Sequence, residues 1–244
     1  KMLKDNILNF INKYNLDSSS SRGDTPVIIT ASDSKLAVQF KSEDATILGK
    51  IVAQNIDLPD GKYGVFNTST LLALCKLMQN EFDINVLHEG DAANIPTKLI
   101  LSDSSYRAEF ILADLDIIPS AESRLLAPEY DVVIEITSSI IDRYVKSLAA
   151  LPAQFVAFRS KKGRLELIIN YSSQTSNTII LDLGPDNSNA LIAPLVFNAS
   201  RLKDILLANK DLIDGKISFC QNFAELIFKS ETIMAKYYIS SIID

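Results

Sequence analysis

The chain contains the stretch VFNTSTL at residues 65–71 and its near-copy VFNASRL at residues 196–202, an offset of 131 residues. Five of the seven positions are identical, and an amphipathic segment follows each copy. Upstream of each copy lies a second helical pattern, in which apolar residues follow the i, i+3, i+4 spacing of a helix that buries one face. Because the same order of helices and strands surrounds both copies, we interpret the repeat as an internal duplication.

Between the predicted helices the chain reads as β structure. Alternating or β-branched runs occupy, among others, residues 35–40, 45–53, 106–112, 178–183 and 233–239, and Asp-Gly, Glu-Gly and Lys-Gly pairs mark turns. The sequence therefore predicts an α+β fold of two similar domains, each with two helices on antiparallel sheets. The domains are expected at residues 1–114 and 131–244, joined by a connector at 115–130 that has two prolines and no clear period.

Composition excludes several classes of function. The 244 residues include one histidine, His88, which rules out most catalytic triads and multi-histidine metal sites, and no phosphate-binding or dinucleotide-binding glycine motif is present. Asp114 and Asp116 lack further acids in register, so we expect no metal and no cofactor. Cys75 and Cys220 lie in apolar segments and are expected to be buried free thiols of a cytoplasmic protein. No stretch is apolar enough to cross a membrane.

The net charge of −6 is unevenly distributed. The four predicted helical segments, at 1–16, 67–80, 137–150 and 198–213, carry nine basic and four acidic residues, whereas the remainder carries 15 and 26. Lys and Arg are good helix formers, which explains part of this bias, but Glu is equally good and is absent from all four segments. A basic surface built from these helices suits contact with the phosphates of duplex DNA of any sequence.

Three passages resemble the DNA sliding clamp family, which includes proliferating cell nuclear antigen and phage clamps. The Phe-Asn-x-Ser-x-Leu entry into a basic helix, once in each half, resembles the second helix of each clamp domain. Residues 105–116 resemble the last strand of the first domain running into the connector, and MAKYYI at 234–239 resembles the final strand of the second domain. The tail at 240–244 lacks an obvious clamp ending. Two domains favour a phage or eukaryote-like trimer over a three-domain bacterial dimer.

The resemblance implies a non-enzymatic processivity factor that encircles duplex DNA as a homotrimeric ring and has a DNA polymerase and a clamp-loader ATPase as partners. A phage-encoded clamp acts in the cytoplasm of its host cell. In clamps the helices line the hole, so the side chains expected to face DNA are Lys4, Lys13, Lys76, Arg143, Lys146, Arg201, Lys203 and Lys210.

The family also implies two protein-binding surfaces. A strand at 106–112 is expected to pair with a strand near 178–183 of the next subunit, using Tyr106, Ala108, Phe110, Thr178, Ile180 and Leu181. Partner peptides are expected in a pocket beside the connector, formed by Leu115, Ile117, Ile118, Leu125, Leu126, Pro128, Ile239 and Ile242. These pocket residues are equally compatible with a connector simply pinned to the sheet.

Two alternatives stay open from the sequence. A monomeric clamp-like processivity factor would hold DNA by direct affinity, with a steep dependence on salt. A hydrolase or transferase with a carboxylate site would leave few marks in the sequence and would lose activity when one or two acids are replaced.

Overall fold

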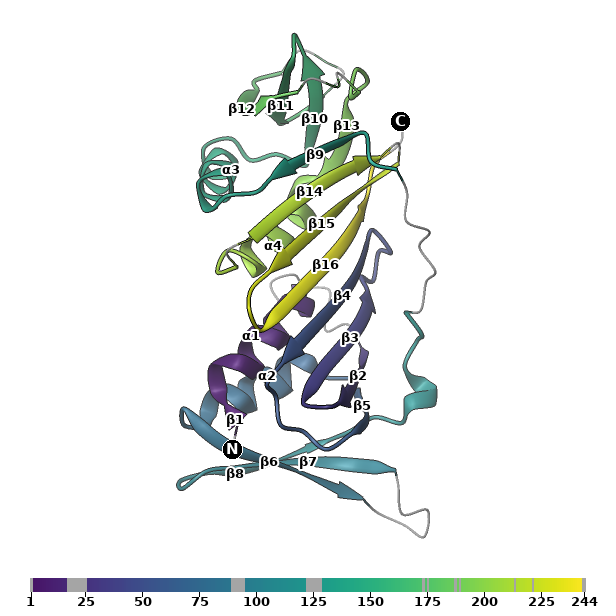
Figure 1. Ribbon diagram of the computed structural model, residues 1–244, viewed down its shortest axis with the longest axis vertical. Coiled ribbons are helices and arrows are strands. Elements are labelled where there is room, and N and C mark those ends of the chain that lie inside the picture. Colours follow the sequence, from purple (N-terminus) through teal and green to yellow (C-terminus); the bar gives the residue numbers. More distant parts are fainter. Residues whose placement is uncertain are drawn as a thin grey trace. The chain divides into compact units, whose positions relative to one another are not determined.

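The computed structural model describes residues 2–16, 26–88, 95–121, 129–172, 174, 176–186, 188, 190–212, 214–220 and 222–242. The chain divides into two compact units (Figure 1). Unit 1 comprises Lys1–Ser123 with Glu231–Ala235, and unit 2 comprises Arg124–Ser230 with Lys236–Asp244.

Unit 1 contains two helices and two antiparallel sheets among its described residues. The helices are α1 (Lys4–Tyr14) and α2 (Thr68–Leu77). One sheet has the order β5-β2-β3-β4, from β2 (Val27–Ser32), β3 (Lys35–Lys41), β4 (Ile47–Gln54) and β5 (Gly61–Val65). The other has the order β1-β6-β7-β8, from β1 (Met2–Leu3), β6 (Glu81–His88), β7 (Pro96–Ser102) and β8 (Arg107–Ile111). A short 3₁₀ helix, η2 (Leu115–Ile117), follows β8.

Unit 2 repeats this plan. Its helices are α3 (Ser138–Ala150) and α4 (Ala199–Ala208). Four adjacent strands of one sheet have the order β16-β15-β14-β9, from β9 (Val132–Glu135), β14 (Asp214–Cys220), β15 (Phe223–Lys229) and β16 (Ile233–Ser240), and the residues of β16 up to Ala235 are grouped with unit 1. The other has the order β12-β11-β10-β13, from β10 (Phe155–Lys161), β11 (Arg164–Ile169), β12 (Ile179–Pro185) and β13 (Leu195–Asn198). The predicted α+β fold with two helices and antiparallel sheets in each half is confirmed.

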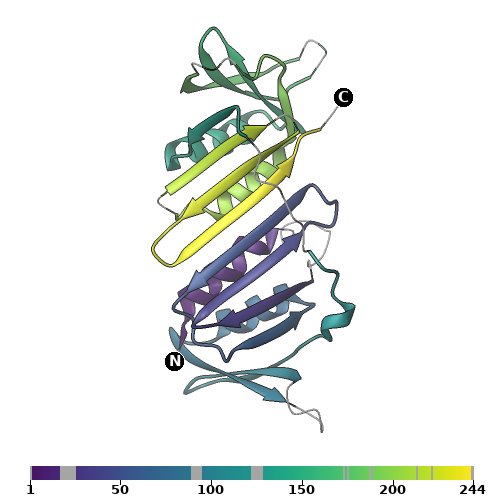
Figure 2. The same ribbon diagram turned by 45° about the vertical axis from the view of Figure 1, so that its right-hand side comes forward.

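The core of each unit lies between the helices and one face of the sheets. In β3 every second residue is buried, which places Leu36, Val38 and Phe40 on the face that α1 and α2 cover (Figure 2). In unit 2 the rings of Phe158, Phe197 and Phe219 pack with centroids 4.6–6.5 Å apart. Basic residues of β3 such as Lys35 and Lys41 are exposed, on the opposite face of the sheet from the helices.

The repeated stretch marks the entry to a helix in both units. Val65 ends β5 before α2, and Val196 to Asn198 lie in β13 directly before α4. The Asn198 side chain accepts a hydrogen bond from the backbone N–H of Arg201 and caps α4, as expected for Asn at a helix start. Asn67 occupies the same place before α2 without such a bond. The duplication therefore preserves where each helix begins, but only one of the two caps is formed by a side chain.

Candidate functional site

The outward faces of α3 and α4 carry most of the exposed basic side chains on the helices. In α3 the buried residues are Ile141, Tyr144 and Ser147, and this leaves Arg143 and Lys146 exposed on the opposite side. In α4 Lys210 is exposed just beyond the last turn, and Lys203 is half-buried on the same side. These four residues of unit 2, all predicted to face DNA, are accessible to a large anionic partner.

The prediction is wrong for two residues. Lys13 and Arg201 are 1% and 2% exposed, so neither side chain is presented to solvent. α1 packs against both α2 and β4, and its buried arc is therefore wider than the Leu3/Ile7/Ile11 stripe and takes in Lys13. Arg201 lies beside Leu202 and one turn before Ile205, on the buried side of α4. Both side chains interact within the fold, as buried charges must.

Lys4 and Lys76 complete the predicted set. The Lys4 ammonium donates hydrogen bonds of 2.7 Å to the backbone carbonyls of Lys76 and Met78. It therefore satisfies carbonyl groups at the C-terminal end of α2, where the helix dipole favours a positive charge. Lys76 is exposed in the last turn of α2.

Local ion pairs hold part of the basic surface of unit 2 in place. The Lys210 ammonium lies 2.7 Å from the Asp142 carboxylate and joins the end of α4 to α3. This hydrogen bond and the positive charge of Lys210 lower the pKa of Asp142. Arg143 reaches the backbone carbonyl of Asp182 in β12 at 3.5 Å, the outer limit of a hydrogen bond.

Among the described residues several strands end a sheet, namely β1, β5, β8, β9, β12 and β13, and two of these carry the predicted interface residues. β8 ends one sheet of unit 1 and β12 ends one sheet of unit 2. Among the predicted interface residues, Tyr106 and Thr178 are exposed, Ala108 and Leu181 are half-buried, and Phe110 faces the core. Ile180 is 51% exposed, and Ile111, which the sequence analysis did not single out, is 73% exposed. Exposed apolar residues on an open sheet edge are typical of strands that pair with another chain.

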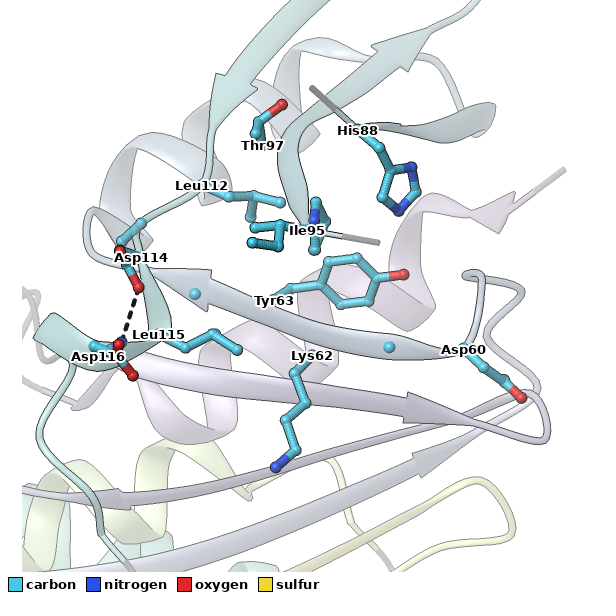
Figure 3. A pocket seen from close by; sticks show the side chains of 14 residues that line it. Asp60, Lys62, Tyr63, His88, Ile95, Thr97, Leu112, Asp114, Leu115 and Asp116 are labelled. Atoms are coloured by element: carbon cyan, nitrogen blue, oxygen red, sulfur yellow. Dashed lines mark hydrogen bonds between the residues drawn. The ribbon is translucent and has the colours of Figure 1, made fainter. Parts of the chain in front are cut away.

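A cavity of about 530 Å³ lies beside the start of the connector in unit 1. Figure 3 shows Leu112, Ile95 and His88 on one side of it, across from Tyr63 of β5 and Leu115 of η2. Asp60, Asp114 and Asp116 also line the cavity, with Lys62 as the basic residue. The cavity is therefore apolar inside and has carboxylates around it. Such a cavity suits a ligand with an apolar side chain that is flanked by basic groups.

Beside the cavity, the backbone of β5 packs closely against the residues that precede the connector. The Ala113 N–H donates a 2.8 Å hydrogen bond to the Gly64 carbonyl, and a Cβ at Gly64 would lie only 2.3 Å from the Ala113 oxygen. The Asp114 carboxylate accepts from the backbone N–H of Asp116 at 3.0 Å and caps η2, which gives one member of this acidic pair a structural role. Burial and the charge of Asp60 raise the pKa of Tyr63, whose hydroxyl donates to the Pro59 carbonyl.

The predicted partner pocket is only partly assembled from the expected residues. Leu115 lines the cavity, Ile117 is exposed next to it, and Ile118 is buried against Gly64. Leu125, Leu126 and Pro128 lie outside the described residues. Ile239 is buried in the core of unit 2, because alternation along β16 turns it to the helix side, so its expected place in a pocket is wrong. Ile242 is partly exposed and bridges to Val196.

Three further residues that were not predicted from the sequence, Tyr63, Ile95 and Leu112, line the cavity. Tyr63 belongs to β5, a short strand that was not predicted, and the contact between residues 61–64 and 112–116 is made over a long sequence separation. Periodicity within one element does not predict a contact between segments so far apart in the sequence. Within the described residues there is no cluster of three metal-binding side chains and no helix long and apolar enough to span a membrane.

Two units of similar plan, each with two helices and antiparallel sheets, form the DNA-clamp fold. Solved structures with this fold include proliferating cellular nuclear antigen from Entamoeba histolytica, with a TM-score of 0.72, 14% identity and coverage of 99% of this chain and 96% of that chain. The PCNA2–PCNA3 complex from Sulfolobus tokodaii has a TM-score of 0.71 and 15% identity, with coverage of 98% of this chain and 97% of that chain. A. fulgidus PCNA bound to the C-terminal region of FEN-1 has a TM-score of 0.72 and 14% identity, with coverage of 100% of this chain and 97% of that chain. The chain therefore has the fold of the PCNA sliding clamps over its whole length.

This likeness is one of structure alone. No protein-family model and no curated protein sequence matches the chain.

Proposed function

We propose that the chain is a DNA sliding clamp, a non-enzymatic protein that assembles into a closed ring and tethers a DNA polymerase to duplex DNA. One observation carries the proposal: in a fold shared with the clamps, the four helical segments carry more basic than acidic residues, whereas the rest of the chain carries more acidic than basic residues. Lys and Arg on such a surface contact phosphates without reading sequence, which is what a protein that slides requires.

The two terminal strands support assembly into a ring. We propose that β8 of one subunit pairs with β12 of the next, a head-to-tail contact that closes when the rotation between subunits permits. Alternation places Ala108 and Phe110 on one face of β8, and Ile179 and Leu181 on one face of β12, so both strands offer an inward apolar row. Ile111 and Ile180 are the exposed apolar residues that such pairing would cover.

The first test is the mass in solution, by light scattering after size exclusion over a concentration series. A closed trimer has a mass of about three times 26.9 kDa. A monomer at every concentration would overturn the ring and favour the alternative, a monomeric clamp-like factor that holds DNA by direct affinity.

A matched pair of variants locates the interface. Ile180→Asp places a charge on β12 and should convert the trimer to monomer, because an unpaired carboxylate would be buried at the contact. Val133→Asp places the same charge on an exposed residue of β9, in the other sheet of unit 2, and should leave the mass unchanged. The reverse pattern would place the interface at β9.

We further propose that partner proteins, a DNA polymerase and a clamp-loader ATPase among them, dock short segments in the cavity beside Leu115. Peptides selected from a random library on the wild-type chain should lose binding to Leu115→Asp and keep it with Leu207→Asp, an exposed leucine on α4. Equal binding to both variants would exclude this cavity as the partner site. Because Cys75 and Cys220 are buried free thiols, we propose the reducing cytoplasm as the compartment.

A further inference from the structure

The exposed faces of the four helices differ in charge between the two units. On α1 the outward residues are Asp5, Leu8, Asn9 and Asn12, so that this face carries an acid and no base. On α2 the outward residues are Ser69, Thr70, Ala73, Lys76 and Leu77, with Lys76 as the basic member. The outward faces of α3 and α4 hold Arg143, Lys146, Lys203 and Lys210.

The two other basic residues on the helices of unit 1 do not make up this difference in outward basic side chains between the units. Lys13 is buried within the fold. Lys4 directs its ammonium to two carbonyls at the end of α2 and is held there by two 2.7 Å hydrogen bonds. These bonds use two of the three ammonium protons, so Lys4 has only one donor left for a phosphate and is held beside α2.

Asp142, Asp204 and Asp211 offset part of the charge on this side of unit 2, but the unit keeps four accessible basic side chains, and the number of such side chains that reach phosphates sets the counterion release. Asp142 is paired with Lys210 and lies to the side of the ridge formed by Arg143 and Lys146. Asp204 is half-buried, one position from Lys203 along α4. Arg143 and Lys146 are exposed and Lys203 is half-buried, and each of the first two lies within electrostatic reach of one acid, Arg143 of Asp182 and Lys146 of Asp142.

We infer that the helices of unit 2, and not those of unit 1, make the phosphate contacts to duplex DNA. This inference rests on the proposed function. In a three-subunit ring it gives three basic surfaces that alternate with three nearly neutral ones, in place of a uniformly basic lining. The neutral faces of α1 and α2 offer amides and hydroxyls, which hydrogen-bond phosphate but release few counterions.

A matched pair of single substitutions tests the inference in the full chain. Lys146→Ala and Lys76→Ala each remove one exposed lysine from a helix, one in unit 2 and one in unit 1. Binding to a short fluorescent duplex of arbitrary sequence is followed by anisotropy over a series of salt concentrations. In the Lys146→Ala variant, the slope of the logarithm of the binding constant against the logarithm of the salt concentration should become shallower by about one. In the double variant, Arg143→Ala and Lys146→Ala together, it should become shallower by about two. Lys76→Ala should match the wild type.

Each outcome has a distinct meaning. Equal losses for Lys76→Ala and Lys146→Ala would overturn the inference and leave DNA binding by the helices intact. Loss with Lys76→Ala alone would reverse the assignment of the two units. If even the triple replacement of Arg143, Lys146 and Lys203 by Ala leaves binding unchanged, DNA contact through the helices fails, and the proposed function fails with it. Unchanged mass and melting temperature of each variant show that fold and assembly are preserved.

Discussion

At the scale of single residues, the location of a charge along a helix does not decide what the charge does. Lys4, Lys13 and Lys76 all belong to the helices of unit 1, yet one binds carbonyls, one is buried and one is exposed. Burial and backbone contacts therefore separate lysines that act within the fold from a lysine that is open to solvent, which makes their roles testable one at a time.

Replacing Lys4 by Met should affect stability rather than DNA binding. The two hydrogen bonds to the end of α2 are lost, and the urea midpoint should fall by the equivalent of about 1 kcal/mol. Lys76→Met removes an exposed ammonium from α2 and should leave the urea midpoint unchanged. Equal midpoints for the two variants would contradict the capping role of Lys4.

Gly64 is required for the close approach of β5 to the connector. Gly64→Ala forces a Cβ against the Ala113 carbonyl and should destabilise the chain by about 1–3 kcal/mol. Gly61→Ala is the control, because the atom closest to its Cβ would be the Tyr63 hydroxyl at 3.4 Å. Thermal melting of both variants provides the measurement, and an unaffected Gly64→Ala would show that the connector moves away without cost.

At the scale of elements, one carboxylate organises the turn that starts β8. Asp103 accepts hydrogen bonds from the backbone N–H groups of Gln79, Ser105 and Tyr106, at 2.7–2.8 Å. It thereby links the segment after α2 to the residue at which the proposed interface strand begins. These backbone bonds hold the pKa of Asp103 below its ordinary value.

This lowered pKa predicts a loss of stability in acid. Because the folded pKa lies below the unfolded value of about 4, the stabilisation is fully present above the unfolded pKa and disappears as the pH falls through the folded pKa. The urea midpoint of the wild type should therefore decrease below about pH 4, and Asp103→Asn should show a smaller decrease. An identical pH dependence in both proteins would remove Asp103 as a contributor.

At the scale of the whole molecule, strand pairing between subunits has a direct spectroscopic consequence. Amide hydrogens on the open edges of β8 and β12 should exchange more slowly as concentration rises and the ring forms, because partner carbonyls then bind them. Exchange on the edge of β9 should stay constant over the same series. Rising mass without protection in β8 or β12 would place the association on another surface.

The sequence by itself determined the duplication, the α+β class and most elements, because a period of 3.6 or 2 is a local property that burial of one face imposes. It located both strands of the proposed interface as well, since β8 and β12 alternate clearly. Five strands were missed: β1, β5, β9 and β13 have only two to five residues, and β2 has six, and the pairing of each comes from neighbours in its sheet.

Only the tertiary structure decided which basic residues reach solvent and which residues line the cavity. Lys13 and Arg201 are buried because several elements cover their helices, and a one-helix pattern cannot count those neighbours. Ile239 faces the core because the register of β16 sets its side. Tyr63 and Leu115 line one cavity because β5 and η2 are brought together although α2 and three strands, β6 to β8, lie between them in the sequence. Local periodicity specifies which face of an element is apolar, whereas the packing of distant segments specifies how much of it is covered.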